Sequence, residues 1–314
     1  MRYIERLCEA SNSVFSIISD KFSKLNGEIY HYCPAEAAEG ILKNSTLRFT
    51  DRRMQTDHDE AVYPLILFQD SIIDIIPSDY FLDAKLKKRF IEECNKACSH
   101  RISDPFSEGF YIFQACFTTD EKGVLWRIFN SDYCMTFDNK ELLSKLQLVN
   151  KPFYKDQPQK FFYGRVMYSK EKQVDLMKEL LDEFLPLVLS DPVKCGITAR
   201  LLVDRILLLG SFFVNDKHQH ECEYKFVLNL AKDSNDATEF TVIENKIQMM
   251  RRGTAKVPYF DVPFASPALT HIRVENQDGL DYALEEIHKW AQYSFPHLCG
   301  RSSISIDEWV ELRK

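Results

Sequence analysis

Two glutamates stand two positions apart at the start of an apolar run, as Glu221-Cys222-Glu223 in ECEYKFVLNL (221–230). In a strand, side chains two positions apart point to the same face of the sheet. Two carboxylates on one face repel each other, and burial raises the pKa of such a group. This pair would be costly in a core and useful in a site. The alternative is an edge strand whose two carboxylates lie in water.

A histidine, His31, stands between two tyrosines in IYHYC (29–33). The run has the branched and aromatic residues that strands favour. The imidazole of His31 is either held by a hydrogen bond in a core or exposed at a site. A helix-like run and the charged stretch DRR follow it, and this context favours a site.

Two groups of residues have side chains that bind metals. Cys94, Cys98 and His100 could share an ion along a helix, but the chain offers no matching second half-site. The run HQHEC (218–222) lies where we predict a strand, and consecutive strand residues point to opposite faces. We therefore expect no metal. The chain also has no GxGxxG, GxxxxGK[ST] or GxSxG motif, which argues against Rossmann, P-loop and hydrolase-elbow sites.

Composition predicts a globular protein. The 314 residues are 45% hydrophobic and carry a net charge of −7, which opposes attraction of the whole surface to nucleic acid or anionic lipid. A local basic group at 85–89 is interpreted as the wet face of a helix. Nine cysteines are scattered without a CxxC pair, which is typical of a reducing compartment. The N-terminus has no uninterrupted apolar segment, and the longest apolar run is about half of what a bilayer requires. We expect a cytoplasmic protein without membrane contact.

The spacing of apolar residues predicts interspersed helices and strands without a regular βαβ rhythm. The expected helices are 2–25, 34–45, 83–99, 171–189, 196–214 and 278–293. The expected strands include 29–33, 46–50, 110–118, 161–169, 221–230, 239–244, 268–275 and 302–306, with LWRIF (125–129) and DYCMTFD (132–138) following the strand at 110–118. Residues 51–60 are interpreted as a charged loop. The pattern predicts an α+β fold, with a mixed, mostly antiparallel sheet flanked by helices. We expect an N-terminal helix in 1–27 and one α+β domain in 28–314, with a helical insertion around 171–214.

Four stretches resemble a large, mostly bacterial domain-of-unknown-function family, number twenty-nine seventy-one, of a type associated with abortive infection and phage defence. They are YHYCPAEAAEGILKNSTLRFTDRRMQTDHDE, QACFTTDEKGVLWRIFNSDYCMTFD, HQHECEYKFVL and KVPYFDVPFASPALTHIRV. They follow one another in order through most of the chain. The resemblance implies a distant relationship to ADP-ribosyltransferases, whose α+β core contains a split sheet, and hence an NAD-consuming enzyme in bacterial defence or toxin action.

The resemblance implies catalytic roles for two residues. His31 matches the histidine on the first strand of one ADP-ribosyltransferase clade, and Glu223 matches the glutamate at the last position of the triad. Cleavage of the nicotinamide–ribose bond of NAD passes through a cation like that of glycoside cleavage, so a carboxylate beside it is required. Glu223 would supply this carboxylate, and His31 would bind a ribose hydroxyl of the adenosine half.

The resemblance also implies residues that bind NAD, and each has a structural alternative. Tyr32 or Trp126 would stack on nicotinamide, yet each could be an ordinary strand or core aromatic. Arg53 would bind the pyrophosphate, or it would pair with a neighbouring aspartate. Glu221 would join these residues in binding the dinucleotide. His31 and Glu223 must then open onto one cleft.

The chain also departs from the family pattern. Where the family carries WSHY, this chain has WRIF (126–129), and Lys225 replaces an arginine. Lysine lacks the planar donor fork of arginine. Three functions therefore remain open. The first is an ADP-ribosyltransferase or NAD glycohydrolase that acts on NAD, with a protein or nucleic-acid acceptor. The second is an inactive protein-interaction module of the same fold. The third is a metal-dependent nuclease, which only the run at 218–222 supports.

Overall fold

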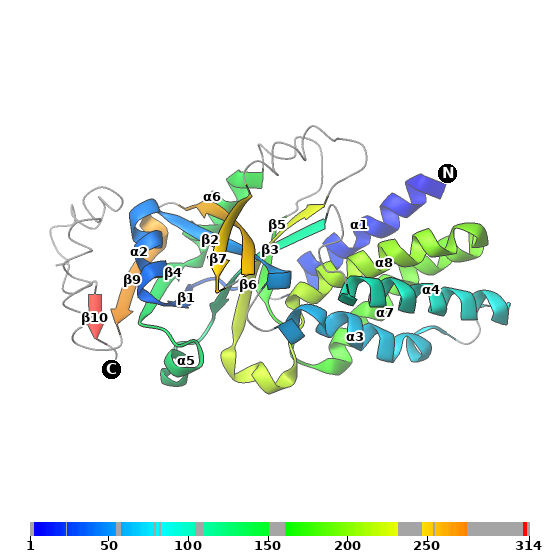
Figure 1. Cartoon of the computed structure of the whole chain (residues 1–314), viewed down its shortest axis with the longest axis horizontal. Coiled ribbons are helices and arrows are strands. Elements are labelled where there is room, and N and C mark those ends of the chain that lie inside the picture. Colours follow the sequence, from blue (N-terminus) through cyan, green and yellow to red (C-terminus); the bar gives the residue numbers. More distant parts are fainter. Residues whose placement is uncertain are drawn as a thin grey trace.

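The structure is a computed structural model, in which a sheet with its covering helices lies beside a bundle of long helices (Figure 1). It describes residues 3–22, 24–54, 58–77, 80–81, 83–103, 110–150, 161–231, 247–253, 255–264, 266–274 and 310–312. The expected elements at 239–244, 278–293 and 302–306 lie outside these ranges. No helix in the described ranges has both the length and the apolar character needed to cross a membrane.

The helices and strands alternate irregularly along the chain. The helices are α1 (Tyr3–Lys21), α2 (Ala35–Asn44), α3 (His58–Ile75), α4 (Ala84–Ser103), α5 (Gly123–Ile128), α6 (Asn139–Asn150), α7 (Lys170–Ser190) and α8 (Cys195–Leu209). The strands are β1 (Glu28–Cys33), β2 (Thr46–Asp51), β3 (Phe110–Thr118), β4 (Tyr133–Asp138), β5 (Phe161–Arg165), β6 (Glu223–Ala231), β7 (Gln248–Arg252), β8 (Ala255–Pro263), β9 (Leu269–Val274) and β10 (Val310–Leu312). Short 3-10 helices include η1 (Arg52–Met54), η3 (Gly210–Phe212) and η4 (Asp216–Glu221).

The ten strands in the described ranges form one curled sheet in which β9 and β10 are parallel and the other pairs antiparallel. The order is β10-β9-β4-β1-β3-β2-β8-β7, with β6 between β3 and β5. The predicted fold class, an α+β protein with a mixed and mostly antiparallel sheet flanked by helices, is confirmed.

The pairing of β3 is split along one edge. On its other edge β3 pairs with β6 from Phe110 to Thr118. A residue of an antiparallel strand has at most one partner on each side. The split edge is therefore shared: Thr118 pairs with Tyr30 of β1, and Gln114 pairs with Thr50 of β2. Between these two points, residues 115–117 have no strand partner on this edge within the described ranges, so β1 and β2 diverge there.

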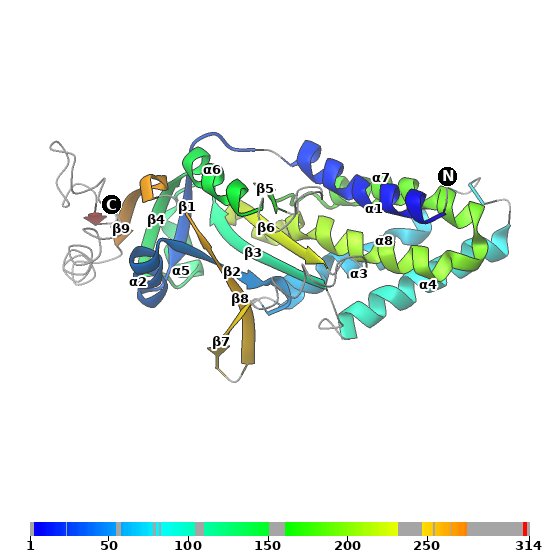
Figure 2. The same ribbon diagram turned by 90° about the horizontal axis from the view of Figure 1, so that it is seen from above.

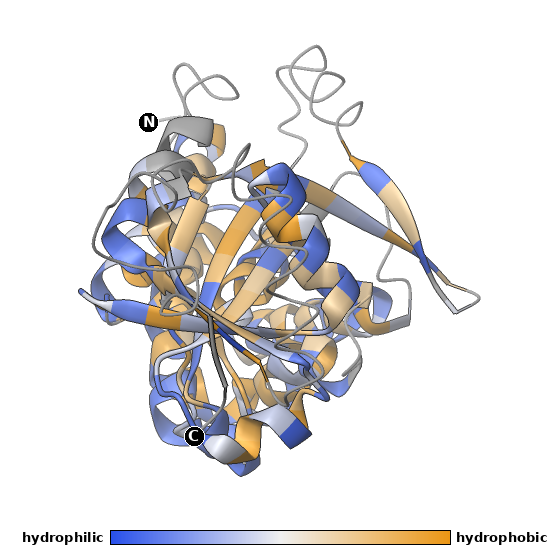
Figure 3. Ribbon diagram, turned by 90° about the vertical axis from the view of Figure 1, so that its left-hand side faces the viewer, coloured by the Kyte–Doolittle hydropathy of each residue, from blue (hydrophilic) through white to orange (hydrophobic). Residues whose placement is uncertain are grey.

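The two faces of the sheet support two cores. One face packs with α2 and α6 around a cluster that includes Phe49, Phe137 and Phe226. On the other face, Ile112 of β3 and Val227 of β6 pack into the core of α1, α3, α4, α7 and α8. The helices at 171–214 are therefore part of a bundle that also contains the N-terminal helix. Figure 3 looks onto the sheet end and shows hydrophobic strands enclosed by more hydrophilic outer segments.

One prediction fails at the start of α3. The run 51–60 was expected to be a loop, but residues 52–54 form a 3-10 turn and α3 begins at His58. Pro64 lies inside α3 and lacks the N–H that would bond the carbonyl of Glu60. Arg52 supplies the missing donor, because its guanidinium bonds the Glu60 carbonyl at 3.0 Å. The same guanidinium bonds the carbonyls of Leu207 and Gly210 at the end of α8.

Candidate active site

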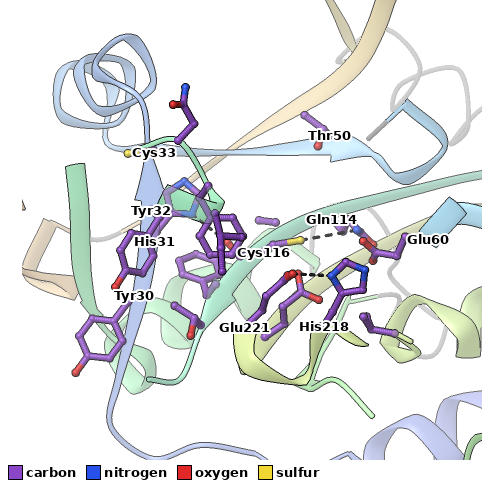
Figure 4. A pocket seen from close by; sticks show the side chains of 18 of the residues that line it. Tyr30, His31, Tyr32, Cys33, Thr50, Glu60, Gln114, Cys116, His218 and Glu221 are labelled. Atoms are coloured by element: carbon purple, nitrogen blue, oxygen red, sulfur yellow. Dashed lines mark hydrogen bonds and ion pairs between the residues drawn. The ribbon is translucent and has the colours of Figure 1, made fainter. Parts of the chain in front are cut away.

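A cavity of about 1110 Å³ opens where β1 and β2 diverge, between the sheet and α3 (Figure 4). Its wall combines segments that are far apart in the sequence. The residues that line it include Tyr30, His31, Tyr32, Arg48, Thr50, Glu60, Tyr63, Gln114, Cys116, Phe129, Lys217, His218, Glu221, Glu223 and Met250. Ligand pockets for small molecules typically have volumes of about 300–1,000 Å³, so this cavity is large enough for a dinucleotide.

The inner wall of the cavity continues the face of β6 that enters the helical core. Val227, Lys225 and Glu223 alternate onto that face, because strand side chains alternate with a period of two. Val227 packs with the helices, Glu223 lines the cavity, and Lys225 is buried between them behind the cavity wall. The strand thus changes from apolar to charged along one face.

Behind this wall, Lys225 contacts two carboxylates. Its side chain is 0% exposed. The ammonium donates to Glu60 Oε1 of α3, and lies 3.3 Å from Glu223 Oε2. Glu223 itself is 7% exposed, and its Oε2 receives no well-oriented hydrogen bond from any described residue. The backbone N–H of Glu223 donates to the Tyr168 hydroxyl at 2.8 Å, which fixes the start of β6. Lys225 therefore lies between two acids, and Glu223 can accept a further hydrogen bond at Oε2.

The three charged groups, Glu60, Lys225 and Glu223, shift one another's pKa values. Burial, together with the negative charges of Glu60 and Glu221, raises the pKa of Glu223 to about 7, although Lys225 opposes the shift. Burial also acts to raise the pKa of Glu60, but the adjacent Lys225 outweighs it and the pKa is lowered. Burial disfavours the charge of Lys225, yet the two acids raise its pKa. Glu60 is thus the permanent counter-ion of Lys225, while Glu223 titrates near neutrality.

His31 fills the gap in the split edge of β3. Its Nδ1 lies 3.0 Å from the carbonyl oxygen of Cys116, one of the β3 residues without a strand partner on that edge. A carbonyl only accepts, so Nδ1 carries the proton. Burial lowers the pKa of His31 despite this hydrogen bond, so the ring is neutral and Nε2 is an acceptor. The ring also packs against Phe117, with centroids 5.2 Å apart.

The sheet register sets the spacing of the two catalytic candidates. Tyr30, beside His31, pairs with Thr118, and Thr118 pairs with Glu223. Two strand spacings separate the Cα atoms of Tyr30 and Glu223 by about 10 Å. His31 and Glu223 both line the same cavity.

Glu221 lines the cavity, but by a different route from the one expected. It ends the 3-10 helix η4 and does not belong to the strand of Glu223. Cys222 between them has φ 48°, a left-handed conformation that turns the chain into β6. Glu221 Oε1 lies 2.7 Å from His218 Nδ1, which also lines the cavity (Figure 4). The argument from alternation was therefore wrong in its geometry, although both glutamates reach one cavity.

The two aromatic candidates differ in position. Tyr32 lines the cavity and meets Trp126 edge to face, with centroids 5.5 Å apart. Trp126 is 2% exposed, belongs to a small apolar cluster and does not line the cavity. The assignment of Trp126 to nicotinamide stacking is therefore corrected: its position is that of a core residue that supports Tyr32.

Arg53 does not line the cavity either, and its assignment to the pyrophosphate is corrected. Its guanidinium pairs with the buried carboxylate of Asp51, with Nε 2.8 Å from Oδ1. This is the salt bridge that the sequence left open. Two other cations, Arg48 and Lys217, do line the cavity.

Sequence reasoning missed Glu60 and Lys225 as members of the site. A signal for Lys225 is present in EYKFVLNL, where a lysine interrupts an apolar strand. A buried ammonium needs a counter-ion, so such a lysine predicts an acid from another segment. That acid could not be identified, because Glu60 stands in a stretch interpreted as a loop.

Among the residues that the structure describes, no group of three or more histidine, cysteine or acidic side chains is arranged to hold a metal ion. No family model matches the chain, and neither a curated protein nor a solved structure matches it. The resemblance to the domain-of-unknown-function family stays a prediction from the sequence.

Proposed function

We propose that this protein is an NAD-consuming, ADP-ribosyltransferase-like enzyme, acting in bacterial defence or toxin action. The observation that carries the proposal is the single cavity shared by His31 and Glu223, in which Glu223 is buried and has a pKa of about 7. At this pKa a large share of Glu223 is ionised at neutral pH, so the residue can present a carboxylate to NAD and later accept a proton.

The proposed reaction breaks the bond between the nicotinamide nitrogen and C1′ of the ribose. Nicotinamide leaves with the electron pair of that bond, and C1′ acquires the character of an oxocarbenium ion. Glu223 stabilises this cation with its negative charge. A hydroxyl group of the acceptor, or water, then bonds to C1′ and gives its proton to Glu223. A pKa of about 7 suits a group that accepts a proton near neutral pH.

Other lining residues would position the dinucleotide. Neutral His31 offers Nε2 as an acceptor for a ribose hydroxyl, and Tyr32 offers an aromatic ring supported by Trp126. Arg48 and Lys217 replace Arg53 as candidate partners of the pyrophosphate. Glu60 acts through Lys225, because it keeps the ammonium paired while Glu223 changes its charge.

The test is nicotinamide release from NAD by the purified full chain, together with NAD binding. We expect Glu223→Gln to lower the rate by about 10²–10³-fold, the usual effect of removing one group that stabilises transition-state charge. Glu39→Gln, on the exposed side of α2, removes an equal charge outside the cavity and should leave the rate unchanged.

Release that Glu223→Gln leaves undiminished would overturn the assignment of this residue. A wild-type protein that neither binds NAD nor releases nicotinamide would overturn the enzymatic proposal. The inactive protein-interaction module would then be the better hypothesis.

A further inference from the structure

Strands β7 and β8 form a two-stranded ribbon that leaves the body of the protein (Figure 2). The inner part of β8, from Tyr259 to Pro263, pairs with β2. Its outer part, from Ala255 to Pro258, pairs with β7 alone among the described strands. Figure 3 shows the same ribbon projecting to the right.

The outer part of the ribbon holds two cations directly opposite each other. Arg251 of β7 is the Cα partner of Lys256 of β8, and both residues are exposed. Like charges on directly opposed strand positions destabilise the pair. Neither side chain forms an ion pair or hydrogen bond with a residue that the structure describes.

The basic group on α4 shows that this arrangement is not general. Lys88 lies 3.8 Å from Glu92 one helical turn away, and Lys87 donates to the carbonyl of Ile76. Each of these two cations has a partner within the protein. The ribbon instead presents two positive charges to the outside, where an anion could bridge them.

The root of the ribbon adjoins the cavity. Met250 of β7 and Arg48 of β2 both line the cavity. Arg48 lies over the Tyr259 ring, 4.0 Å from its centroid, and pairs with Asp261, so β2 and β8 hold it in place. Met250 and Arg251 are consecutive strand residues and point to opposite faces, so the ribbon presents Arg251 and Lys256 on the face turned away from the cavity.

We propose that the β7–β8 ribbon binds the phosphate backbone of double-stranded nucleic acid through Arg251 and Lys256. A two-stranded β-ribbon fits the major groove, which is about 12 Å wide. Phosphate contacts by arginine and lysine position such a ribbon without specifying sequence. Whether the bound nucleic acid also accepts ADP-ribose rests on the proposed function, but the binding does not.

The experiment measures binding of a labelled DNA duplex of about 20 base pairs to the full chain between about 50 and 200 mM salt. Each phosphate contact adds about 0.9 to the slope of log K against log salt, so Arg251→Gln/Lys256→Gln should reduce that slope by about 1.8. Lys87→Gln/Lys88→Gln removes the same charge from α4 and should keep the wild-type slope.

Equal slopes for the two double variants would overturn the proposal, as would binding of polyglutamate in preference to the duplex. The second result would assign the ribbon to an acidic protein partner. Nicotinamide release without nucleic acid should be the same in Arg251→Gln/Lys256→Gln as in wild type. Failure of the ribbon proposal therefore leaves the enzymatic proposal standing, and the reverse also holds.

Discussion

The helical bundle and the cavity lie side by side on the same face of β3 and β6. In the bundle, Ile112 and Val227 extend a core of leucine, isoleucine and phenylalanine side chains. A few residues further along the same strands, that face carries Gln114 and Glu223, which line the cavity, and Lys225, which is buried behind them. Burial stabilises the apolar side chains of the bundle, whereas beside the cavity it alters the pKa values of buried charged groups.

Stability and the proposed function therefore depend on different parts of the same strands. Apolar contacts do not depend on pH, whereas a buried acid and its counter-ion do. If the comparison holds, changes in the cavity will have large effects that depend on charge and pH. Changes in the bundle will have effects that depend on volume.

The largest expected effect comes from Lys225→Met. It leaves the buried Glu223 and the half-buried Glu60 without their cation, and removal of one partner from a buried ion pair costs about 3–5 kcal/mol of unfolding free energy. Urea unfolding measures this loss. Lys21→Met is the matched control, because Lys21 pairs with Glu179 at the surface and such pairs contribute about 1 kcal/mol or less.

Restoring neutrality should recover most of that loss. The triple variant Lys225→Met/Glu60→Gln/Glu223→Gln removes the buried charges together, and such replacements are often close to neutral in stability. If Lys225→Met costs no more than Lys21→Met, the trio is not a buried charge cluster.

The next effect is on the pH dependence of stability. Glu223 has a pKa of about 7 in the folded state against an ordinary 4.5, so the folded state holds more protons between these values. Its contribution to stability is complete below about pH 4.5 and is lost as the pH rises through about 7, a total of about 3 kcal/mol at about 1.4 kcal/mol per pH unit.

Two other groups act in the opposite direction. Glu60, with its lowered pKa, loses its contribution as the pH falls below 4.5. His31, with its lowered pKa, gains stability as the pH rises towards 6.5. The difference in unfolding free energy between wild type and Glu223→Gln therefore isolates Glu223. A difference that stays constant from about pH 5 to pH 7.5 would refute the raised pKa.

The smallest effect tests the bundle. A Cβ added at Gly210 would clash with side-chain carbons of Pro64, so Gly210→Ala should cost about 1–3 kcal/mol through overpacking. Thermal or urea unfolding at two pH values should give the same cost. Gly40→Ala, inside α2 with nothing within 4 Å of the added carbon, should instead stabilise by about 0.5–1 kcal/mol. A cost of Gly210→Ala that changes with pH would contradict the distinction between the bundle and the cavity.

Sequence periodicity was sufficient to predict the fold class and most of the strands that contribute to the site. The run around His31 and the run that begins at Glu223 were identified because apolar residues recur with the spacing of strands. Their meeting at one cavity depends on the pairing of both with β3, and that pairing is set by contacts between distant segments. The hydrogen bond from His31 to Cys116 has no local signal for the same reason.

The start of α3 shows why the rest was not predictable. Pro64 is a helix breaker in a sequence, and the charged residues before it are typical of a loop. The helix forms because a guanidinium from η1 satisfies the carbonyl that the proline leaves without a donor. The predictions for Trp126 and Arg53 failed for another reason. Their residue types suit a ligand, but in the structure they contact Tyr32 and Asp51 of the protein instead.

The different reach of Arg52 and Pro64 has a consequence for inheritance. A mutation at Arg52 removes a donor from three carbonyls, those of Glu60, Leu207 and Gly210, whether or not Pro64 is also replaced. Another residue at position 64 restores one backbone amide, and the Glu60 carbonyl can accept from that amide and from Arg52 together. Descendants of this chain should therefore keep Arg52 more strictly than Pro64.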